Sequence, residues 1–369
     1  MKNTILSLAI AAGLLVPIPH VRAESSDHDA KTQKNKGNNL SNVQMYSAAR
    51  GSASGSDWMA LVEDSRSVGS LTIPGTHDSM ALHETILSSA QCQWFTLRDQ
   101  LHMGVRCLDI RCRHMKDGFA IHHGMEYQHA NFTDVLTTCQ QFLKEHPKET
   151  ILMIVKREYD DEPGITRSFA ETFMSYVGKF PDLFALKTTH VPVLNNEIRG
   201  KIVLIRRFDE KETVYTKWVL GPGFLPKLVP DKNSAKEVNV QVGGIDASHW
   251  PDNPETVVPV GDAIQLEDCY DLGDYFWPVA PWNYKWSIIQ KGLDAAAQDP
   301  EGKYLHLTFT SGVAFNKVGQ PFIRTVSDDI NPRLDAFFTK NPKGHYGTIL
   351  MDFAWAEIVR KIYSVNFAN

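Results

Sequence analysis

The chain has 369 residues, of which 43% are hydrophobic and 22% charged, and its formal net charge is -5. This balance argues against a nucleic-acid partner, because phosphate backbones recruit proteins with basic faces. The length suits either two ordinary domains or one α/β barrel of roughly 250 residues or more with insertions.

The first 23 residues have the pattern of a secretory signal. Lys2 supplies a positive charge, an apolar run covers residues 5–16, and Val21-Arg22-Ala23 ends in a small residue that suits signal peptidase. The run is too short for a membrane helix, and no later stretch approaches the ~20 apolar residues that such a helix needs. We therefore expect residues 1–23 to be removed and the mature protein to be secreted, extracellular and soluble.

Residues 24–56 are rich in Ser, Asn, Lys and Gly and poor in large apolar side chains. Such a segment cannot offset the entropy cost of its own ordering, so we expect a flexible polar tail. The folded domain is expected to span residues 57–369. It begins near Asp57-Trp58-Met59, where a polar capping residue precedes an apolar cluster.

The chain has five cysteines, an odd number. In the oxidising environment that an exported chain meets, at most two intrachain disulfides can form, and the sequence does not fix their pairing. A cysteine metal site is disfavoured because no Cys-x-x-Cys pair occurs.

Short β-rich runs alternate with helical patterns through the folded region. Several runs are nearly continuous in Val, Ile and Leu, which is typical of strands buried on both faces of a parallel sheet. The pattern predicts an α/β fold, a single (β/α)8 TIM-like barrel, rather than two domains. The eight runs cover residues 70–73, 105–110, 119–122, 150–155, 201–205, 263–266, 304–309 and 348–351.

Helical patterns lie between these runs, at residues 132–146, 165–177, 284–297 and 356–364. Pro147 follows the first pattern and Gly178 the second, and both are typical helix stop signals. The stretch 208–261 is rich in Pro, Gly, Asn and Val, so we expect long loops or an insertion there. In a parallel barrel, polar side chains just after the strands converge on one pocket at the C-terminal face.

The polar residues at the predicted strand ends have the composition of a phosphate site. They combine two histidines, several cations and carboxylates to orient them, which is what in-line attack on a phosphodiester requires. The set is His77, Asp78, Asp109, Arg111, His123, Lys156, Glu158, Arg206, Arg207, Asp268, Tyr270 and Asp352.

Two local patterns sharpen the choice of histidines. His77 directly follows a β-rich run within Pro74-Gly75-Thr76-His77, where Pro and Gly force a sharp exit that presents the side chain. His122 and His123 are adjacent and therefore point to opposite faces of a strand. We expect His123, which precedes Gly124, to enter the barrel mouth.

Two pairs of opposite charge have the spacing that places both side chains on one face of a strand. Asp109 and Arg111 form one pair, and Lys156 and Glu158 form the other. Each pair either lies in the site or is an ion pair that closes the barrel, and the spacing leaves both interpretations open.

Five blocks of the sequence carry a family pattern. They are Ile73 to Ser79, Gly104 to Arg113, His122-His123-Gly124, Glu149-Thr150-Ile151 with Lys156-Arg157-Glu158, and Gly200 to Leu204. Their order and spacing resemble the bacterial-type phosphatidylinositol-specific phospholipases C. The resemblance covers residues 58 to the C-terminus, more weakly over 208–261 and 272–300. It implies a distorted, incompletely closed barrel that acts on phosphatidylinositol at a membrane surface.

The resemblance also implies roles. His77 is the general base that deprotonates the inositol 2-hydroxyl, and His123 is the general acid that protonates the departing diacylglycerol oxygen, so that inositol 1,2-cyclic phosphate forms. Asp352 orients the base, Asp78 partners the acid and Arg111 holds the phosphate. Lys156, Glu158, Arg207, Asp268 and Tyr270 match the set that contacts inositol, and from its pairing with Arg111 we expect Asp109 to bind substrate with them.

Arg111 decides the expectation about metal. Calcium-dependent relatives carry an acidic ligand after the second strand, because a hard divalent cation needs several oxygens. A guanidinium at this position supplies the charge itself, with bidentate geometry that suits phosphate, so we expect no metal and no cofactor.

Two alternatives stay open. A metal-dependent glycerophosphodiester phosphodiesterase or sphingomyelinase-D-like enzyme would need a carboxylate cluster where Arg111 lies. A non-catalytic secreted protein that binds inositol phosphates or lipid head groups would not need an acid and base pair.

The contact with the membrane is less defined by sequence. The family's first-helix tryptophan has no counterpart within residues 86–93. An aromatic group, Tyr275-Phe276-Trp277 with Trp282, Trp286 and Phe315, either docks on the bilayer or belongs to the core. Whether glycosylphosphatidylinositol anchors are cleaved depends on how open the pocket is toward the inositol 6-position. We expect a monomer.

Overall fold

The central sheet is built from short aliphatic runs that are buried on both faces, as the sequence predicts. In the computed structural model, eight of the described strands run parallel in the order β11-β6-β5-β2-β1-β18-β15-β13. Their bounds are β1 Ile73–Thr76, β2 Cys107–Met115, β5 Ile151–Arg157, β6 Ile202–Arg207, β11 Ile245–Asp246, β13 Ile264–Glu267, β15 Leu305–Phe309 and β18 Thr348–Met351.

The strand order is that of a barrel that does not close. At one edge β12 (Val258–Val260) pairs antiparallel with β13, and at the other edge lies β11. No pairing joins these two edges within the ranges that the structure describes. The expected distorted barrel is therefore confirmed.

The structure describes residues 54–84, 90–221, 227–274, 281–315 and 321–368, which all belong to one unit, Ala49–Asn369. The expected signal sequence, residues 24–53 of the expected tail, and Tyr275-Phe276-Trp277 lie outside the described residues. Residues 54–56, which the sequence assigns to the tail, are tied to the barrel, because Arg106 Nη2 donates to the carbonyls of Gly55 and Ser56.

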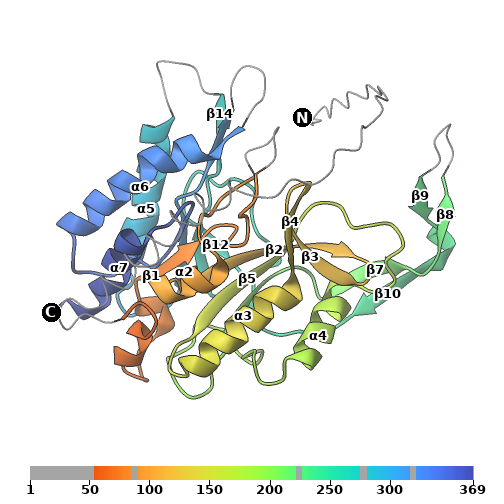
Figure 1. Cartoon of the computed structure of the whole chain (residues 1–369), viewed down its shortest axis with the longest axis horizontal. Helices are drawn as coiled ribbons and strands as arrows, with labels where there is room; N and C mark the ends of the chain where they lie inside the picture. The colour runs from red at the N-terminus through yellow and green to blue at the C-terminus, as the bar shows by residue number, and fades with distance from the viewer. Residues whose placement is uncertain (1–53, 85–89, 222–226, 275–280, 316–320, 369) are drawn as a thin grey trace, which may run out of the picture. The chain divides into compact units, whose positions relative to one another are not determined.

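Helices lie around the sheet (Figure 1). Two begin at capping boxes, Asn131 with Asp134 before α3 and Ser168 with Glu171 before α4. Gly178 lies within α4 rather than just past its end. The helices are α2 Leu97–Met103, α3 Phe132–Glu145, α4 Phe169–Lys179, α5 Trp282–Ala297, α6 Ile323–Lys340 and α7 Ala356–Ser364, with 3-10 turns at Trp58–Leu61, Val68–Ser70, Lys232–Ser234 and Val365–Phe367.

The run at residues 119–122 is not a barrel strand, which corrects the sequence prediction. It forms β3 (Gly118–His123), which pairs antiparallel with the second half of β2 and with β4 (Glu126–Asn131). Lys116 and Asp117 form the connecting turn with φ values of 50° and 54°. Two consecutive residues with positive φ make the tight turn that a hairpin prefers, and the usual Asn-Gly signal is absent from it.

The eighth parallel strand comes instead from the stretch 208–261, where the sequence predicts loops or an insertion. That stretch contains β11 and, before it, two antiparallel pairs. These are β7 (Lys211–Tyr215) with β10 (Ala235–Asn239), and β8 (Trp218–Leu220) with β9 (Leu228–Pro230). A further small sheet contains β14 (Asp271–Asp274), β16 (Val313–Phe315) and β17 (Pro321–Phe322).

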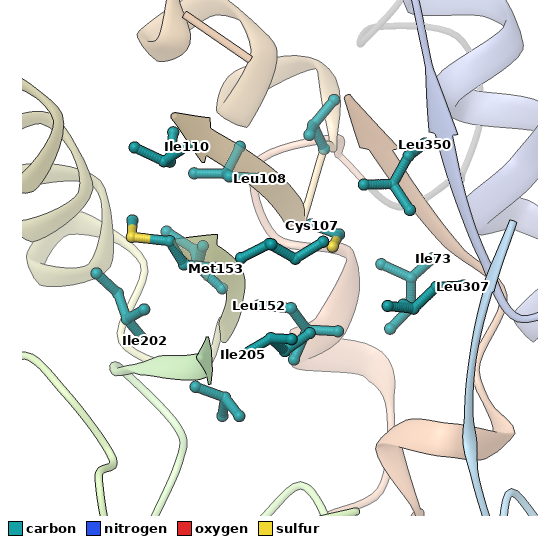
Figure 2. Close-up of a cluster of buried hydrophobic side chains, with 14 of the residues drawn as sticks. Ile73, Cys107, Leu108, Ile110, Leu152, Met153, Ile202, Ile205, Leu307 and Leu350 are labelled. Carbon is teal, nitrogen blue, oxygen red and sulfur yellow. The ribbon is translucent and has the colours of Figure 1, made fainter. Parts of the chain in front are cut away.

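Aliphatic side chains from the parallel strands form the core. Figure 2 shows Ile73, Leu108, Leu152, Ile205 and Leu350 among the buried side chains that neighbouring strands contribute. Trp282 and Trp286 pack against this core, which favours the core interpretation for these two aromatics. None of the helices in the described ranges is long and apolar enough to cross a membrane.

The five cysteines are all buried and free. The disulfides that the sequence allowed are therefore not formed. The thiols of Cys107, Cys112 and Cys139 pack in the hydrophobic core, which is a common environment for a free cysteine.

Candidate active site

The carboxyl ends of the parallel strands surround a pocket of about 440 Å³. Nine of the residues selected from sequence line it: His77, Arg111, His123, Lys156, Glu158, Arg207, Asp268, Tyr270 and Asp352. The structure therefore brings together side chains that lie up to 275 positions apart in the chain. Asp78 and Asp109 lie beneath the wall of the pocket and do not line it.

His77 is held at both ring nitrogens. Its Nδ1–H donates to Asp352 Oδ1 at 2.7 Å, and Arg111 Nη2 lies 2.7 Å from its Nε2. Because a guanidinium can only donate, Nε2 accepts this bond and the imidazole is neutral. Asp352 follows β18 and is itself held by Asn331 of α6, which donates to its backbone carbonyl. The result is a base with a fixed tautomer.

Arg111 is surrounded by carboxylates. Its Nε donates to Asp109 Oδ2 at 3.1 Å, and carboxylate oxygens of Asp78 and Glu158 lie 3.8 and 3.9 Å from the guanidinium. Burial would lower the pKa of Arg111, but these three carboxylates hold it well above its ordinary value. The pocket therefore keeps a permanent positive charge next to the base.

Asp109 contacts Arg111 rather than the pocket, which corrects the expectation that it binds substrate. Its Oδ2 accepts from the Arg111 side chain and from the backbone N–H of Asp78, both at 3.1 Å. Burial alone would raise the pKa of Asp109, but the Arg111 guanidinium holds it below its ordinary value. Its position suits a residue that fixes the direction of the guanidinium.

His123 lies at the end of β3, with its ring centroid 6.4 Å from that of His77. Its Nδ1–H donates to the Ala90 carbonyl at 2.8 Å, while Cys92 Sγ and Asp78 Oδ2 lie 3.7 and 3.8 Å from the same nitrogen. Nε2 is thus the ring atom that can reach a ligand in the pocket. The hydrogen bond goes to Ala90 and not to Asp78, the partner that the sequence suggests.

Asp78 and His123 nevertheless lie close together, with Asp78 Oδ2 3.8 Å from His123 Nδ1. Burial raises the pKa of Asp78 to about 8, although Arg111 acts to lower it. Burial also lowers the pKa of His123, and Arg111 lowers it further. At neutral pH these two shifts leave one titratable proton on the neighbouring groups and place it on Asp78.

Lys156 and Glu158 form an ion pair of 2.8 Å on the pocket wall. Of the two interpretations that their spacing left open, the structure shows the one in the site. Glu158 also accepts from the backbone N–H of Gly124, next to His123. Burial would raise the pKa of Glu158, but Arg111 and Lys156 hold it at about 2.

An aromatic side chain organises the opposite wall. Arg207 stacks 4.1 Å above the ring of Trp250, whose Nε1–H donates to Asp268 Oδ2 at 2.9 Å. The Tyr270 hydroxyl donates to Asp252 Oδ1 at 2.6 Å. Burial, followed by Asp252, raises the pKa of Tyr270, so the phenol stays protonated. Cations, carboxylates and a hydroxyl therefore alternate around the pocket.

Sequence reasoning missed several contributors. Gln93 Nε2 donates to the backbone carbonyls of His77 and Met351, both at 2.8 Å, and so ties the loop after β1 to β18. Gln93 and Asp252 lie in loops with no strand-end signal, although Trp250-Pro251-Asp252-Asn253-Pro254 is rich in turn formers. Missed pocket residues are Asp252, Ser311, Gly312, Val313 and Ile323.

Comparisons with known proteins agree with the site. Residues 71–208 match the family described as phosphatidylinositol-specific phospholipase C, X domain. The 1-phosphatidylinositol phosphodiesterase of Staphylococcus aureus (strain Newman) is 28% identical over 319 residues, which cover 82% of this chain and 89% of that protein. The Listeria monocytogenes protein of the same name is 34% identical over 165 residues, 42% of this chain and 50% of that protein.

Solved structures show the same architecture. A phosphatidylinositol-specific phospholipase C from S. aureus has a TM-score of 0.65 at 25% identity, over 84% of this chain and 97% of that chain. The L. monocytogenes enzyme has a TM-score of 0.60 at 25% identity, over 85% of this chain and 99% of that one. Another S. aureus structure, described in terms of modulation of membrane binding, has a TM-score of 0.64 at 25% identity, over 85% of this chain and 97% of that one.

Fold and site thus define the class of protein as an enzyme on an open, TIM-like barrel with paired histidines at its mouth. The resemblance that the motifs indicate is confirmed: residues 71–208 match the phosphatidylinositol-specific phospholipase C X domain, and the chain is similar to the bacterial enzymes in sequence and in fold.

Proposed function

We propose that this protein is a secreted phosphatidylinositol-specific phospholipase C that cleaves phosphatidylinositol at a membrane surface and needs no metal. Its products are diacylglycerol and inositol 1,2-cyclic phosphate. The observation that carries the proposal is the line of contacts from Asp352 through His77 to Arg111. It places an oriented base directly beside a cation that can bind phosphate.

The first half of the reaction uses the base. His77 Nε2 takes the proton of the inositol 2-hydroxyl, and the oxygen attacks phosphorus as the new ring bond forms. Arg111 holds the non-bridging phosphate oxygens, for which its planar fork is suited. To do so its Nη2 exchanges the bond to His77 for one to phosphate, which uncovers the base only when the phosphodiester is in place.

The second half uses the acid. As the bond from phosphorus to the glycerol oxygen breaks, His123 donates a proton to that oxygen. The proton comes from the Asp78–His123 pair, which holds it at neutral pH. The negative phosphodiester, once bound, favours the protonated imidazole over the protonated carboxyl: Asp78 gives its proton to solvent and His123 Nε2 takes one from solvent, while Nδ1–H stays bonded to the Ala90 carbonyl. The two histidines end with exchanged protonation states, and hydrolysis of the cyclic product reverses the roles.

The other pocket residues suit a polyol. Lys156, Glu158, Arg207, Asp268 and Tyr270 offer donors and acceptors to the inositol hydroxyls, while paired charges keep the wall close to neutral. Relatives named for phosphatidylinositol support this assignment. We expect the mature protein to act as a monomer after loss of residues 1–23.

The alternatives fit the geometry less well. A phosphodiesterase that relies on a divalent cation needs several carboxylates around the ion, whereas here three carboxylates surround Arg111. A protein that only binds head groups gains nothing from a base held in one tautomer by Asp352.

The proposal is tested by release of diacylglycerol from mixed micelles in excess chelator. Phosphatidylinositol should be cleaved at the same rate with and without the chelator. Phosphatidylcholine and an analogue methylated at the inositol 2-hydroxyl should be inert, because neither offers the internal nucleophile. Loss of activity on chelation that calcium or magnesium restores would reject metal independence, and turnover of the choline lipid would reject the cyclising mechanism.

A further inference from the structure

Cys92 lies between the two histidines and has no part in the proposed chemistry. The ligand atoms of Cys92, His123 and Asp78 all lie within 4.8 Å of one another, and so do those of Cys92, His77 and Asp352. Within the first set, Cys92 Sγ and Asp78 Oδ2 lie 3.7 and 3.8 Å from His123 Nδ1. One thiol is therefore common to two groups of three potential metal ligands.

Unsatisfied carboxylate oxygens point to a cation at this position. Both oxygens of Asp78 and Oδ2 of Asp352 are buried without a hydrogen-bond partner in the described part of the chain. The two side chains are 0% and 1% exposed. Arg111 Nε is 3.8 Å from Asp78, beyond hydrogen-bonding distance. A buried carboxylate without donors is costly unless it is neutralised or coordinated.

We propose that Cys92, His123 and Asp78 bind a borderline-soft divalent cation such as Zn²⁺ or Cd²⁺, and that the ion inhibits the enzyme by occupying the acid's histidine. Thiolate, imidazole and carboxylate are the three donor types that zinc takes, with bonds of about 2.0 to 2.3 Å. Tetrahedral bonds of that length hold the donors about 3.5 Å apart. The two spacings at His123 Nδ1, 3.7 and 3.8 Å, need to contract by only a few tenths of an ångström, and Cys92 Sγ lies within 4.8 Å of the Asp78 carboxylate.

Binding has a proton balance that sets its pH dependence. The Cys92 thiol and the protonated Asp78 carboxyl each release a proton, and the His123 ring gives up its bond to Ala90 so that Nδ1 can coordinate. Binding therefore tightens as pH rises. Calcium and magnesium prefer sets made only of oxygen ligands, so they should not compete.

Binding is tested directly by the ultraviolet charge-transfer band between thiolate and Cd²⁺ in the chelator-treated full-length protein. The band should appear at one equivalent of Cd²⁺, be absent in Cys92→Ala and persist in Cys139→Ala, a matched change of a buried thiol on α3. A wild-type protein without the band, or a Cys92→Ala protein that keeps it, would overturn the site.

Inhibition is tested on a soluble nitrophenyl inositol phosphate and on phosphatidylinositol, and this part rests on the proposed function. Each variant is compared with its own metal-free rate. Zn²⁺ should inhibit the wild type reversibly, and the concentration for half inhibition should rise at least about tenfold in Cys92→Ala. Equal sensitivity of the two proteins would overturn inhibition through Cys92. Failure of the proposed function appears separately, as no turnover without metal.

A second observation concerns the β8–β9 ribbon, which has an apolar band on both faces. The register pairs Val219 with Val229 and Leu220 with Leu228. The exposed fraction is 45% for Val219 and 38% for Val229, and it is 69% for Leu220 and 46% for Leu228. Because successive side chains of a strand alternate, one pair points to each face of the ribbon. A two-stranded ribbon of this kind is marginally stable in water unless something covers it.

The ribbon lies on the pocket side of the barrel. The β7 strand that leads to it begins shortly after Arg207, a pocket residue at the end of β6. At its base, Trp218 Nε1 donates to the carbonyl of Ile165, in the loop that follows Glu158 and β5. Figure 1 shows the ribbon extending beyond β7 and β10.

The charge next to the band is positive, unlike that of the whole chain. Lys217 and Lys227 flank the band and are exposed. Residues 217–236 contain four lysines and one aspartate, whereas the chain has a net charge of -5. Lysines beside an apolar band are suited to an anionic lipid surface, where each contributes about 1 kcal/mol of attraction.

We infer that the β8–β9 ribbon inserts into the interfacial layer of an anionic bilayer and holds the pocket against its substrate. A protein groove would cover one face of the ribbon, whereas a lipid layer surrounds both. The depth that interfacial segments reach, about 5 to 10 Å, is enough for the three paired rows of β8 and β9.

The test is sedimentation with phosphatidylcholine vesicles that contain phosphatidylglycerol, which measures binding without turnover. Leu220→Ser with Leu228→Ser should weaken binding at least about tenfold. Leu61→Ser, a matched leucine that is 63% exposed at the other end of the barrel, should bind as the wild type does. Turnover of the soluble nitrophenyl substrate checks that the ribbon variant is folded.

Lys217→Ser with Lys227→Ser should weaken binding to the anionic vesicles and leave the weak binding to pure phosphatidylcholine unchanged. Equal binding of the leucine variant and the wild type would reject the ribbon as the docking element. Capture of a protein partner by the ribbon with no vesicle effect would reject the lipid as its occupant. Neither result depends on whether phosphatidylinositol is cleaved.

Discussion

Arg111 donates to the atom that the proposed mechanism uses as its base, His77 Nε2. The same side chain is held from behind by Asp109, which it contacts at 3.1 Å. Its function in the account therefore depends on a planar group with several donors in fixed directions, and not on charge alone.

Arg111→Lys should lower kcat on phosphatidylinositol by roughly 10² to 10³, the usual cost of losing a donor aimed at developing charge. An ammonium keeps the charge but cannot span Asp109 and the phosphate together. Arg113→Lys is the matched control, since Arg113 lies two residues further on β2 and donates to the Asp160 carbonyl outside the pocket. A fully active Arg111→Lys enzyme would make the guanidinium a structural group only.

The two histidines are separated by changing the leaving group. His123→Ala should lose about 10² to 10⁴ in rate on the natural lipid, where the glycerol oxygen needs a proton, and much less on a nitrophenyl inositol phosphate. His77→Ala should be crippled on both substrates, because the attacking hydroxyl is the same in each. The reverse pattern would mean that base and acid are exchanged, and equal losses on both substrates would reject separate roles.

The proton on the Asp78–His123 pair gives a prediction for pH. Burial raises the pKa of Asp78 to about 8, so kcat/KM on a soluble short-chain phosphatidylinositol should fall as pH rises through about 8, when the pair loses its proton. In Asp78→Asn the proton rests on His123 alone. Burial and Arg111 both lower the pKa of this histidine. Its alkaline limb should then lie below the ordinary histidine value of about 6.5. An unchanged limb would show that Asp78 does not share the proton.

At the scale of single elements, local signals predict well where the apolar period is clear. The pattern of Ala356 to Ser364 predicts α7 with the bounds that the structure shows. By contrast, α6 was missed, although Val326, Ile330, Leu334 and Phe338 recur every four residues and are buried. Pro332 inside this helix hides the pattern, because proline is normally a helix breaker.

Strand pairing was harder to predict than strand existence. The run at 119–122 is a strand, but an apolar period of two does not say whether its partner is parallel or antiparallel. Alternation, which holds for either partner, meant that only one of His122 and His123 could enter the pocket. His123 was chosen because it precedes Gly124, and it does line the pocket. β11 was missed because two residues, Ile245 and Asp246, are too few to show a period.

A buried ion pair fixes the elements behind the Asp268 side of the pocket. Lys285 of α5 is fully buried, and its Nζ donates to Glu267 and to the carbonyls of Cys269 and Phe309. It thereby joins α5 to the ends of β13 and β15. Burial raises the pKa of Glu267, against the lowering effect of Lys285.

Lys285→Met should lower the free energy of unfolding by about 3 to 5 kcal/mol, because Glu267 is left buried without its partner. The double change Lys285→Met with Glu267→Leu should recover most of this loss, since no buried charge is then unpaired. Urea denaturation of the three proteins measures both values. A loss below about 1 kcal/mol in the single variant would show that water reaches Glu267.

At the scale of the whole molecule, buried histidines set the response to acid. Burial lowers the pKa of His114 to about 4, and Arg157 adds to this effect. Burial likewise lowers the pKa of His345 to about 4, and His306 adds to it. In the unfolded chain both titrate near the ordinary value of about 6.5. Unfolding therefore takes up protons below that value, and acid favours the unfolded state.

The contribution of these two histidines to the free energy of unfolding should accordingly be constant above about pH 6.5. It should fall as the pH decreases from there to about 4, and change little at lower pH. His345→Gln should show a shallower fall over the same window than the wild type does. Urea denaturation at a series of pH values measures the slope. A slope that is equal in both proteins would mean that His345 titrates normally in the folded state.

Sequence placed most of the pocket because its residues follow strands whose buried runs are easy to find. Asp252 and Trp250 escaped, since they lie in a long loop whose path depends on the neighbouring strands. Asp109 was assigned to the substrate because alternation puts it on the same face as Arg111. Alternation cannot show that the longer Arg111 side chain then covers Asp109 and separates it from the pocket.

The most direct measurement of the central claim is phosphorus NMR of the products from phosphatidylinositol in excess chelator. The account predicts an early signal of the five-membered cyclic phosphodiester, inositol 1,2-cyclic phosphate, that forms before any inositol 1-phosphate and equally fast without chelator. A first product that is the acyclic monophosphate, or no product until a divalent cation is added, would contradict it.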